Sequence, residues 1–289
     1  MGFDPFLYVA FAAGAIAGRL TARRSPWIGR AAQASIIVLV GLLGAELAPI
    51  PDPALADTVP VAFGFVTVVM VLTAVLSLAL RRREARGSAK SPTVRLGAFA
   101  FPLLLVVSVG AGFAIGRAVS FPAASWIDYA LYLLLALTAF DLKFSLGAVR
   151  RAGIPLIAAL GGALGGGIVM ALVAGIPWPA ALATSLAFGF YSLSGPLVAA
   201  QFGPALGLLA FLTNFLRENL TMLTAPAVGG RLGGEGLTAI GGATAMDTTL
   251  YFVTRYGDRD FATAALATGL VLTLTATIVV PLLAGLPGA

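Results

Sequence analysis

The chain has 289 residues, of which 59% are hydrophobic and only 10% are charged, and its mean hydropathy is +0.99. One core of a water-soluble domain of this length cannot bury that much apolar surface, so the composition predicts an integral membrane protein. The sequence has no Cys and no His, which excludes disulfides and thiolate metal sites and leaves proton chemistry to carboxylates. The net charge of +6 comes from basic residues between apolar runs, a pattern that favours topology signals over nucleic-acid binding.

Apolar runs recur at the length of about 20 residues that is needed to cross a bilayer. We therefore expect an all-α integral membrane protein with about eight transmembrane helices plus broken or re-entrant segments, forming one polytopic transporter domain over residues 1–289. The first run is followed by Arg residues rather than by a small-residue cleavage site, so it is expected to remain a helix. The clearest predicted spans are residues 5–22, 30–48, 59–80, 95–117, 125–142, 154–175 and 261–285.

Basic residues cluster at 19–30, 81–95 and 143–151, and each cluster follows an odd-numbered span. By the positive-inside rule these loops are cytoplasmic, which predicts a multi-pass protein of the cell membrane with both termini outside. The segment 81–95 is rich in Arg, Ser and Lys, and we expect it to be a cytoplasmic linker.

Two spans resemble each other in sequence. VLVGLLGAEL at 38–47 aligns with LLLALTAFDL at 133–142 and places Glu46 opposite Asp141. The two copies run in opposite directions through the membrane, which predicts an inverted repeat, although Leu-rich helices also align by chance. Both acids end a span, so each is either an ion-coupling residue or a carboxylate in interfacial water, and Asp141 can also pair with Lys143.

Ionisable groups also occur within the apolar stretch 204–228. Its polar side chains recur at helical spacing and share one face of a helix: Asn214, Arg217, Glu218 and Thr221. Arg217 and Glu218 are sequence neighbours that point about 100° apart, so each needs another partner. That partner is either substrate or a residue of another helix in a buried ion pair.

Two more apolar stretches, at 179–201 and 237–254, are interrupted by polar and small residues. The segment 187–204 has several Gly and Pro residues at membrane depth, which predicts a discontinuous helix or a re-entrant hairpin. A Pro-kinked helix without a ligand is the alternative. Ser194 and Gly195 before Pro196 indicate the cap and first turn of a half-helix, whose free N–H groups can hold a carboxylate.

The second interruption, IGGATAMDTTLYF at 240–252, places Asp247 among the hydroxyl groups of Thr244, Thr248 and Thr249. Carboxylate, hydroxyl and unwound carbonyl oxygens together suit a hard cation such as sodium, or an ammonium group. Arg255 is the nearest candidate partner for Asp247 in the sequence. Residues 177–257 are therefore the predicted substrate-site region.

Four motifs of this chain resemble the lysine exporter family of the LysO type: FGFYSLSG at 188–195, FGP at 202–204, LRE at 216–218 and GATAMD at 242–247. The resemblance implies export of L-lysine and its toxic analogue thialysine from the cytoplasm, coupled to an ion gradient. It also implies that Glu218 and Asp247 are the family's intramembrane acids. The residues that match its broken-helix signature are Tyr191, Ser192 and Ser194.

The chain departs from the family's pattern at two places. Asn214 stands where an Asp is expected four residues before Glu218, and Glu46 and Asp141 are acids where neutral polar residues are expected. Such a redistribution of acids is consistent with altered ion coupling or with a different substrate.

Recognition of a cationic amino acid requires carboxylates for its ammonium groups and a donor for its own carboxylate. Glu218 and Asp247 can supply the carboxylates, and either Arg217 or the half-helix start at 194–196 can supply the donor. The sequence thus predicts a secondary transporter of L-lysine or a similar cationic amino acid, with no catalytic residues, cofactor or nucleic-acid partner. A proton or sodium ion is expected to couple at Glu218, Asp247, Thr248, Glu46 and Asp141.

Two other functions are considered. A cation/proton antiporter without an organic substrate needs only membrane carboxylates and Thr oxygens. An intramembrane aspartyl protease could use Asp141 and Asp247, but the expected Gly-x-Gly-Asp pattern is absent. The Gly14-x-x-x-Gly18 pattern permits close helix packing within the chain or between chains, so it leaves the oligomeric state open.

Overall fold

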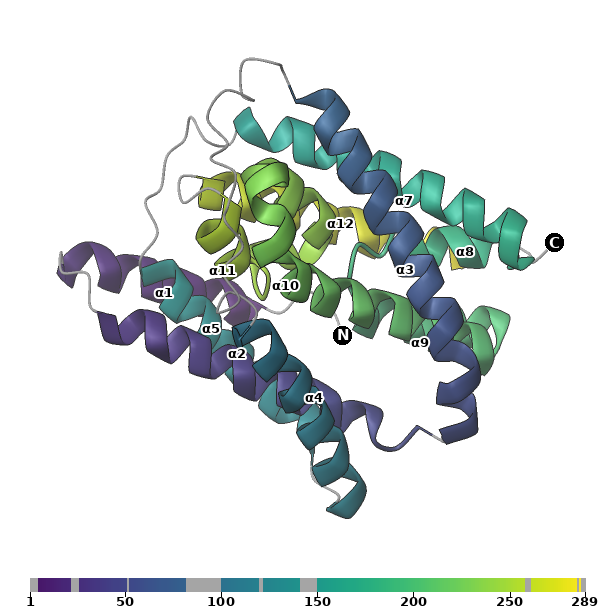
Figure 1. Cartoon of the computed structure of the whole chain (residues 1–289), viewed down its shortest axis with the longest axis horizontal. Coiled ribbons are helices and arrows are strands. Elements are labelled where there is room, and N and C mark those ends of the chain that lie inside the picture. Colours follow the sequence, from purple (N-terminus) through teal and green to yellow (C-terminus); the bar gives the residue numbers. More distant parts are fainter. Residues whose placement is uncertain are drawn as a thin grey trace. The chain divides into compact units, whose positions relative to one another are not determined.

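The computed structural model describes residues 5–21, 26–50, 52–81, 100–119, 122–140, 150–257, 261–284 and 286. Within these ranges every regular element is a helix, so the predicted all-α fold is confirmed for the described part of the chain (Figure 1). The described helices that are long and apolar enough to cross a membrane are Pro53–Leu80, Arg150–Ala174 and Ala262–Leu283, with shorter apolar helices at Arg30–Leu42 and Leu103–Ala118. The number of about eight spans stays a prediction.

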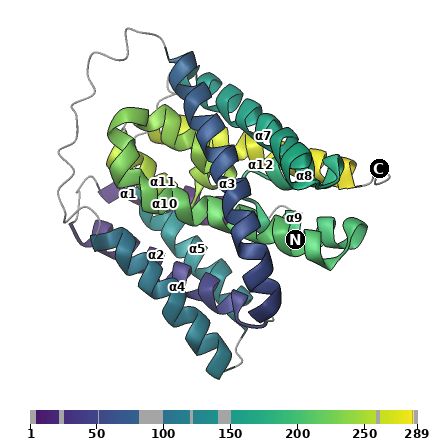
Figure 2. The ribbon, with the colours of Figure 1, turned by 45° about the vertical axis from the view of Figure 1, so that its right-hand side comes forward.

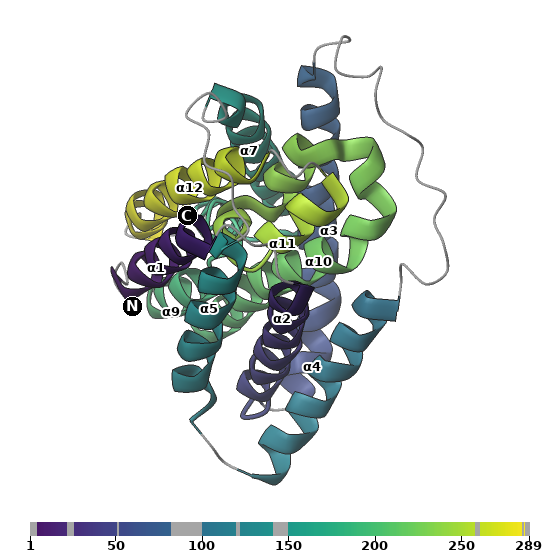
Figure 3. The same cartoon turned by 90° about the vertical axis from the view of Figure 1, so that its left-hand side faces the viewer.

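The chain divides into two compact units, and the first comprises residues 1–51 and 94–144. Within it α1 packs along α5, and α2 packs against α4 and α5 (Figure 3). Gly14 and Gly18 of α1 lie directly against the carbonyl oxygens of Ala136 and Phe140 of α5, where an added Cβ would overlap them. The small-residue pattern therefore serves helix packing within the chain. The helices of this unit are α1 (Pro5–Thr21), α2 (Pro26–Leu47), α4 (Ala100–Ala118) and α5 (Ala123–Phe140).

The second unit comprises residues 52–93 and 145–289 and contains both predicted interruptions. Its long helix α3 packs against α7 and α10 (Figure 1). Except for Arg81, the predicted linker lies outside the described residues. The elements of this unit are α3 (Asp52–Leu80), η3 (Arg150–Ala152), α7 (Gly153–Ala174), α8 (Trp178–Ser185), α9 (Tyr191–Phe202), α10 (Pro204–Gly241), η4 (Gly242–Met246), α11 (Leu250–Phe252), η5 (Val253–Gly257) and α12 (Ala262–Ala284).

Helix α10 covers a region for which the sequence predicts two separate stretches, one that ends at residue 228 and one that begins at residue 237. It is one helical element of 38 residues, interrupted at Gly233, whose backbone is non-helical with φ 64° and ψ −172°. The Arg217 guanidinium donates to the carbonyl groups of Ala239 and Ile240. In a straight helix these residues would lie roughly 33 Å apart along the axis, so α10 must fold back on itself. The bend is visible in the light-green ribbon of Figure 2.

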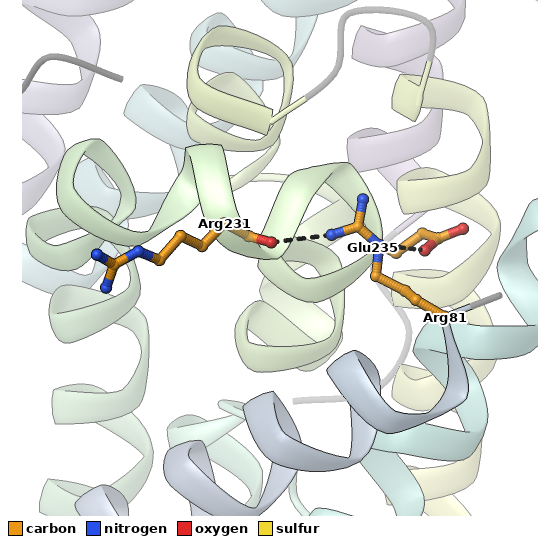
Figure 4. Close-up of polar contacts among 3 residues, drawn as sticks. All are labelled: Arg81, Arg231 and Glu235. Carbon is orange, nitrogen blue, oxygen red and sulfur yellow. Dashed lines mark hydrogen bonds and ion pairs between the residues drawn. The ribbon is translucent and has the colours of Figure 1, made fainter. Parts of the chain in front are cut away.

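We call residues 204–232 the first arm of α10 and residues 234–241 its second arm. Arg81, just after α3, binds both arms (Figure 4). Its Nη1 donates to the carbonyl of Arg231 at 2.9 Å, and its Nε lies 3.2 Å from Glu235 Oε2 as an ion pair. The Arg81 side chain thus fixes the fold-back from both sides of Gly233.

Replacement of Arg81 by Ala is expected to lower the free energy of unfolding by about 1–3 kcal/mol. The substitution leaves a carbonyl at the bend and a largely buried carboxylate without their donor. Arg231→Ala is the matched control, because Arg231 contributes its backbone carbonyl and its side chain points away from Arg81 (Figure 4). Thermal unfolding of the purified protein in detergent measures the difference. Equal melting temperatures for the two variants would contradict a clamping role.

Candidate functional site

The two interruptions meet inside the second unit. The first lies between α8 and α9 at 186–190, and the second follows α10 at 242–249. The backbone N–H of Ala243 donates to the carbonyl of Phe188 at 2.9 Å. A Cβ added to Gly242 would lie 2.5 Å from that same oxygen, and Gly242 has φ 68°, which side chains rarely adopt. The two breaks therefore cross at a contact that only glycine fits.

Phe188 is the one non-glycine residue with positive φ in the described part of the chain, at 54°. This backbone conformation costs about 1–3 kcal/mol and persists only where the surroundings enforce it. Here the enforcing contacts are the hydrogen bond from Ala243 and full burial of the ring, whose centroid lies 5.9 Å from the Arg217 guanidinium carbon. Because strained backbone clusters at functional sites, the crossing is a candidate functional position.

Asn214 ties the first break to α10. Its Oδ1 accepts a hydrogen bond from the backbone N–H of Gly189 at 2.8 Å. Its Nδ2 lies within hydrogen-bond distance of Thr184 O at 2.8 Å, Ala210 O at 3.0 Å and Ser194 Oγ at 3.1 Å. An ionised Asp could not donate to these oxygens, which gives a structural reason for Asn at this position. Asn214 therefore has a positioning role in this geometry.

The predicted half-helix start at 194–196 is wrong. Helix α9 begins at Tyr191, and the N–H groups of Leu193 and Ser194 already donate to the carbonyl of Phe190 at 3.2 and 3.1 Å. The Ser194 hydroxyl, expected to cap the helix, donates instead to Ala210 O at 3.4 Å. The Pro196 signal misled because a helix tolerates Pro in its interior when neighbouring helices support the backbone.

The other predicted residues of this helix have packing contacts. The Tyr191 ring lies edge-on to the rings of Phe211 and Phe215, with centroids 5.3 and 6.0 Å away. A Cβ added to Gly195 would lie 3.1 Å from the Phe211 Cβ, so glycine allows α9 to approach α10 closely. The Ser192 side chain lies outside the described residues.

Arg217 binds the end of its own helix. Nε donates to Ile240 O at 2.9 Å and Nη2 donates to Ala239 O at 3.2 Å, and only 2% of the residue surface is exposed. A cation is favourable there, because the last carbonyl groups of a helix carry partial negative charge. No carboxylate of the described residues is ion-paired with Arg217. The sequence placed Arg217 in the site but could not reveal partners that are backbone atoms.

The fold brings the acids Glu218 and Asp247 together at Thr248. Glu218 is 2% exposed, contacts the Thr248 side chain by a hydrogen bond and interacts electrostatically with Asp247. Asp247 Oδ1 accepts hydrogen bonds from Thr248 N at 2.5 Å and from Thr248 Oγ1 at 3.2 Å. One hydroxyl has a single hydrogen to donate, so it cannot satisfy two carboxylates at once. Because two neighbouring carboxylates in an apolar site repel each other, the pair also needs a proton or a cation.

Three other candidates do not join this site in the described structure. Arg255, the suggested partner of Asp247, is exposed and forms no ion pair with it. Glu46 belongs to α2 of the first unit, but its side chain lies outside the described residues. Asp141, which the protease alternative also needs, lies outside them as well.

Apolar helices, a crossing of two helix breaks and an acid pair of a buried Glu218 and a partly buried Asp247 are typical of a helical membrane transporter. Residues 106–284 match the family model described as "Lysine exporter LysO", which is more than half of the chain. The chain belongs to this lysine exporter family.

Two curated relatives support the assignment. The chain is 35% identical over 161 residues to "Lysine exporter LysO" of Escherichia coli (strain K12), a match that covers 53% of each protein. It is 32% identical over 109 residues to a protein of Haemophilus influenzae named "Putative lysine exporter", which covers 38% of this chain and 55% of the relative. The chain thus matches about half the length of these relatives. No solved structure matches it.

Proposed function

We propose that the protein is a secondary active transporter that exports L-lysine from the cytoplasm, coupled to a proton or sodium gradient. The observation that carries this proposal is the Glu218–Asp247 pair, which shares Thr248 beside a break in the helix. An ammonium group brings one positive charge and three donors, which is what this pair lacks. Family membership and the names of the relatives support lysine as the substrate.

Exchange of lysine for the coupling ion is expected because both would bind the same carboxylates. Because a substrate ammonium group and a coupling ion would bind the same two carboxylates, occupancy by one excludes the other. A gradient that drives protons or sodium into the site from outside then releases lysine there, and cytoplasmic lysine displaces the ion on the other side. Thialysine, which has the same two ammonium groups, is expected to be carried as well.

The remaining features of the proposal concern the whole molecule. We propose that the two units form one multi-pass domain in the cell membrane, with an inverted repeat, a cytoplasmic linker at 81–95 and both termini outside. Three helices of sufficient length and apolarity support a membrane location. Within this proposal Glu46 and Asp141 are further ion-coupling candidates, and the protein transports its substrate without chemical change.

Lysine efflux from proteoliposomes tests the function. With an imposed proton or sodium gradient, the native protein should release labelled lysine, and Asp247→Asn should reduce the rate at least about 30-fold. That loss corresponds to about 2 kcal/mol, within the range for removal of one charged partner. The matched control is Asp57→Asn, because Asp57 is an exposed acid of α3 in the same unit. Lysine efflux by Asp247→Asn at the native rate would contradict the proposed role of the Glu218–Asp247 pair.

The second candidate function is cation/proton antiport without an organic substrate. The acid pair and the Thr248 hydroxyl are consistent with it, since neither group selects an organic molecule by itself. The same proteoliposomes discriminate between the two functions. Discharge of a cation gradient without any lysine movement would favour the antiporter.

A further inference from the structure

A transported amino acid also brings a carboxylate, and a buried carboxylate needs donors. The sequence offered two sources, the half-helix start at 194–196 and Arg217. The structure removes the first, because the N–H groups of Leu193 and Ser194 are bound to Phe190 O. Arg217 remains.

The Arg217 guanidinium is only partly used by the protein. Nε and Nη2 donate to carbonyl groups of the second arm, whereas Nη1 is buried and has no hydrogen-bond partner among the described residues. An unsatisfied buried donor costs about 1–3 kcal/mol, and more when it is charged. Nη1 carries two N–H groups at the end of the side chain, and this end presents the planar fork that binds a carboxylate.

The free nitrogen and one acid of the proposed ammonium site belong to consecutive residues of α10. Arg217 and Glu218 are consecutive residues whose side chains diverge by about 100° on the helix. An amino acid placed between them meets a donor on one side and an acceptor on the other. The guanidinium packs against Gly242, where an added Cβ would lie 3.1 Å from Arg217 Nη2 and crowd it.

We infer that Arg217 binds the α-carboxylate of the transported amino acid through Nη1, while Nε and Nη2 stay on the carbonyl groups of Ala239 and Ile240. The inference rests on the proposed function in one respect, that the substrate is an amino acid. It makes Arg217 a determinant of specificity, because a diamine or an amino-acid amide has the ammonium groups but not the carboxylate.

The test compares acids with their amides on the full-length protein in detergent, at about pH 6, where the amino groups of both are largely charged. Equilibrium binding is measured for L-lysine, L-lysinamide, L-leucine and L-leucinamide. The native protein should bind lysine at least tenfold more tightly than lysinamide. In Arg217→Lys this ratio should fall towards one, because an ammonium group cannot hold the helix end and the carboxylate with one planar fork. Arg231→Lys, an exposed position of the same helix, should keep the native ratio.

Equal binding of lysine and lysinamide by the native protein would overturn the inference, and this comparison requires no variant. An unchanged ratio in Arg217→Lys would overturn it too. If leucine binds, lysine does not, and leucinamide is rejected through Arg217, the carboxylate site stands and lysine as the substrate is wrong. If no amino acid binds, both proposals fail.

Discussion

Gly242→Ala should destabilise the protein by about 3 kcal/mol or more and abolish lysine efflux. The new Cβ would lie 2.5 Å from Phe188 O, at a residue whose φ of 68° already disfavours side chains. Backbone strain and overpacking each cost about 1–3 kcal/mol. Because Phe188 O accepts the hydrogen bond from Ala243, any shift that relieves the overlap separates the two helix breaks.

Gly64→Ala is the control for this substitution. Gly64 lies inside α3 of the same unit with open space around its Cβ position and without a positive φ. Ala is the better helix former, so this variant should be unchanged or more stable by about 0.5–1 kcal/mol. Thermal unfolding in detergent and efflux from proteoliposomes measure both variants. Normal efflux by Gly242→Ala would show that the crossing is looser than its contacts indicate.

Asn214→Asp should lower the free energy of unfolding by about 3–5 kcal/mol when the new carboxylate is ionised. Its oxygens would face the carbonyl oxygens of Thr184 and Ala210, which now accept hydrogen bonds from Nδ2, and an uncompensated buried charge costs that much. Asn219→Asp is the matched control on the same helix, because Asn219 Nδ2 donates only to Phe215 O among the described residues. Asn219→Asp should cost less.

Stability measured by thermal unfolding at neutral pH decides between two possibilities for Asn214. A large loss would confirm that Asn214 holds α8, the first break and α9 on α10. A variant as stable as the native protein would contradict ionisation of the new group, and would mean that the pocket accepts a protonated Asp in the place of the amide.

The helices of this protein could be predicted well from sequence, and the site only in part. The predicted span 154–175 agrees with α7 at Gly153–Ala174, because a run of apolar residues is limited by the same bilayer thickness that limits a helix. Both breaks were predicted from Gly, Pro and Asp at membrane depth. Their crossing was not, because the hydrogen bond between Ala243 and Phe188 joins backbone groups that no side-chain pattern reports.

Arg217 shows the same limit. Helical spacing predicted that the Arg217 side chain lies on the polar face of α10, and the structure agrees. Its partners, however, depend on the fold-back at Gly233, which lies between the predicted stretches 204–228 and 237–254. A glycine that reverses a helix and a glycine that separates two helices leave similar traces in a single sequence, since both supply positive φ.

We expect the fold-back of α10 also to limit leakage of the coupling ion across the membrane. The end of a helix carries the equivalent of about half a negative charge, and the second arm places it on Arg217. This contact partly neutralises the charge of Arg217, and Glu218 and Asp247 form no ion pair with a basic residue in the described part of the chain. A carrier whose acid pair holds neither lysine, proton nor cation is costly to turn around in a bilayer, because two uncompensated carboxylates would have to cross the apolar layer with it. We therefore expect that the empty form does not reorient, so that gradients are not dissipated when no lysine is available.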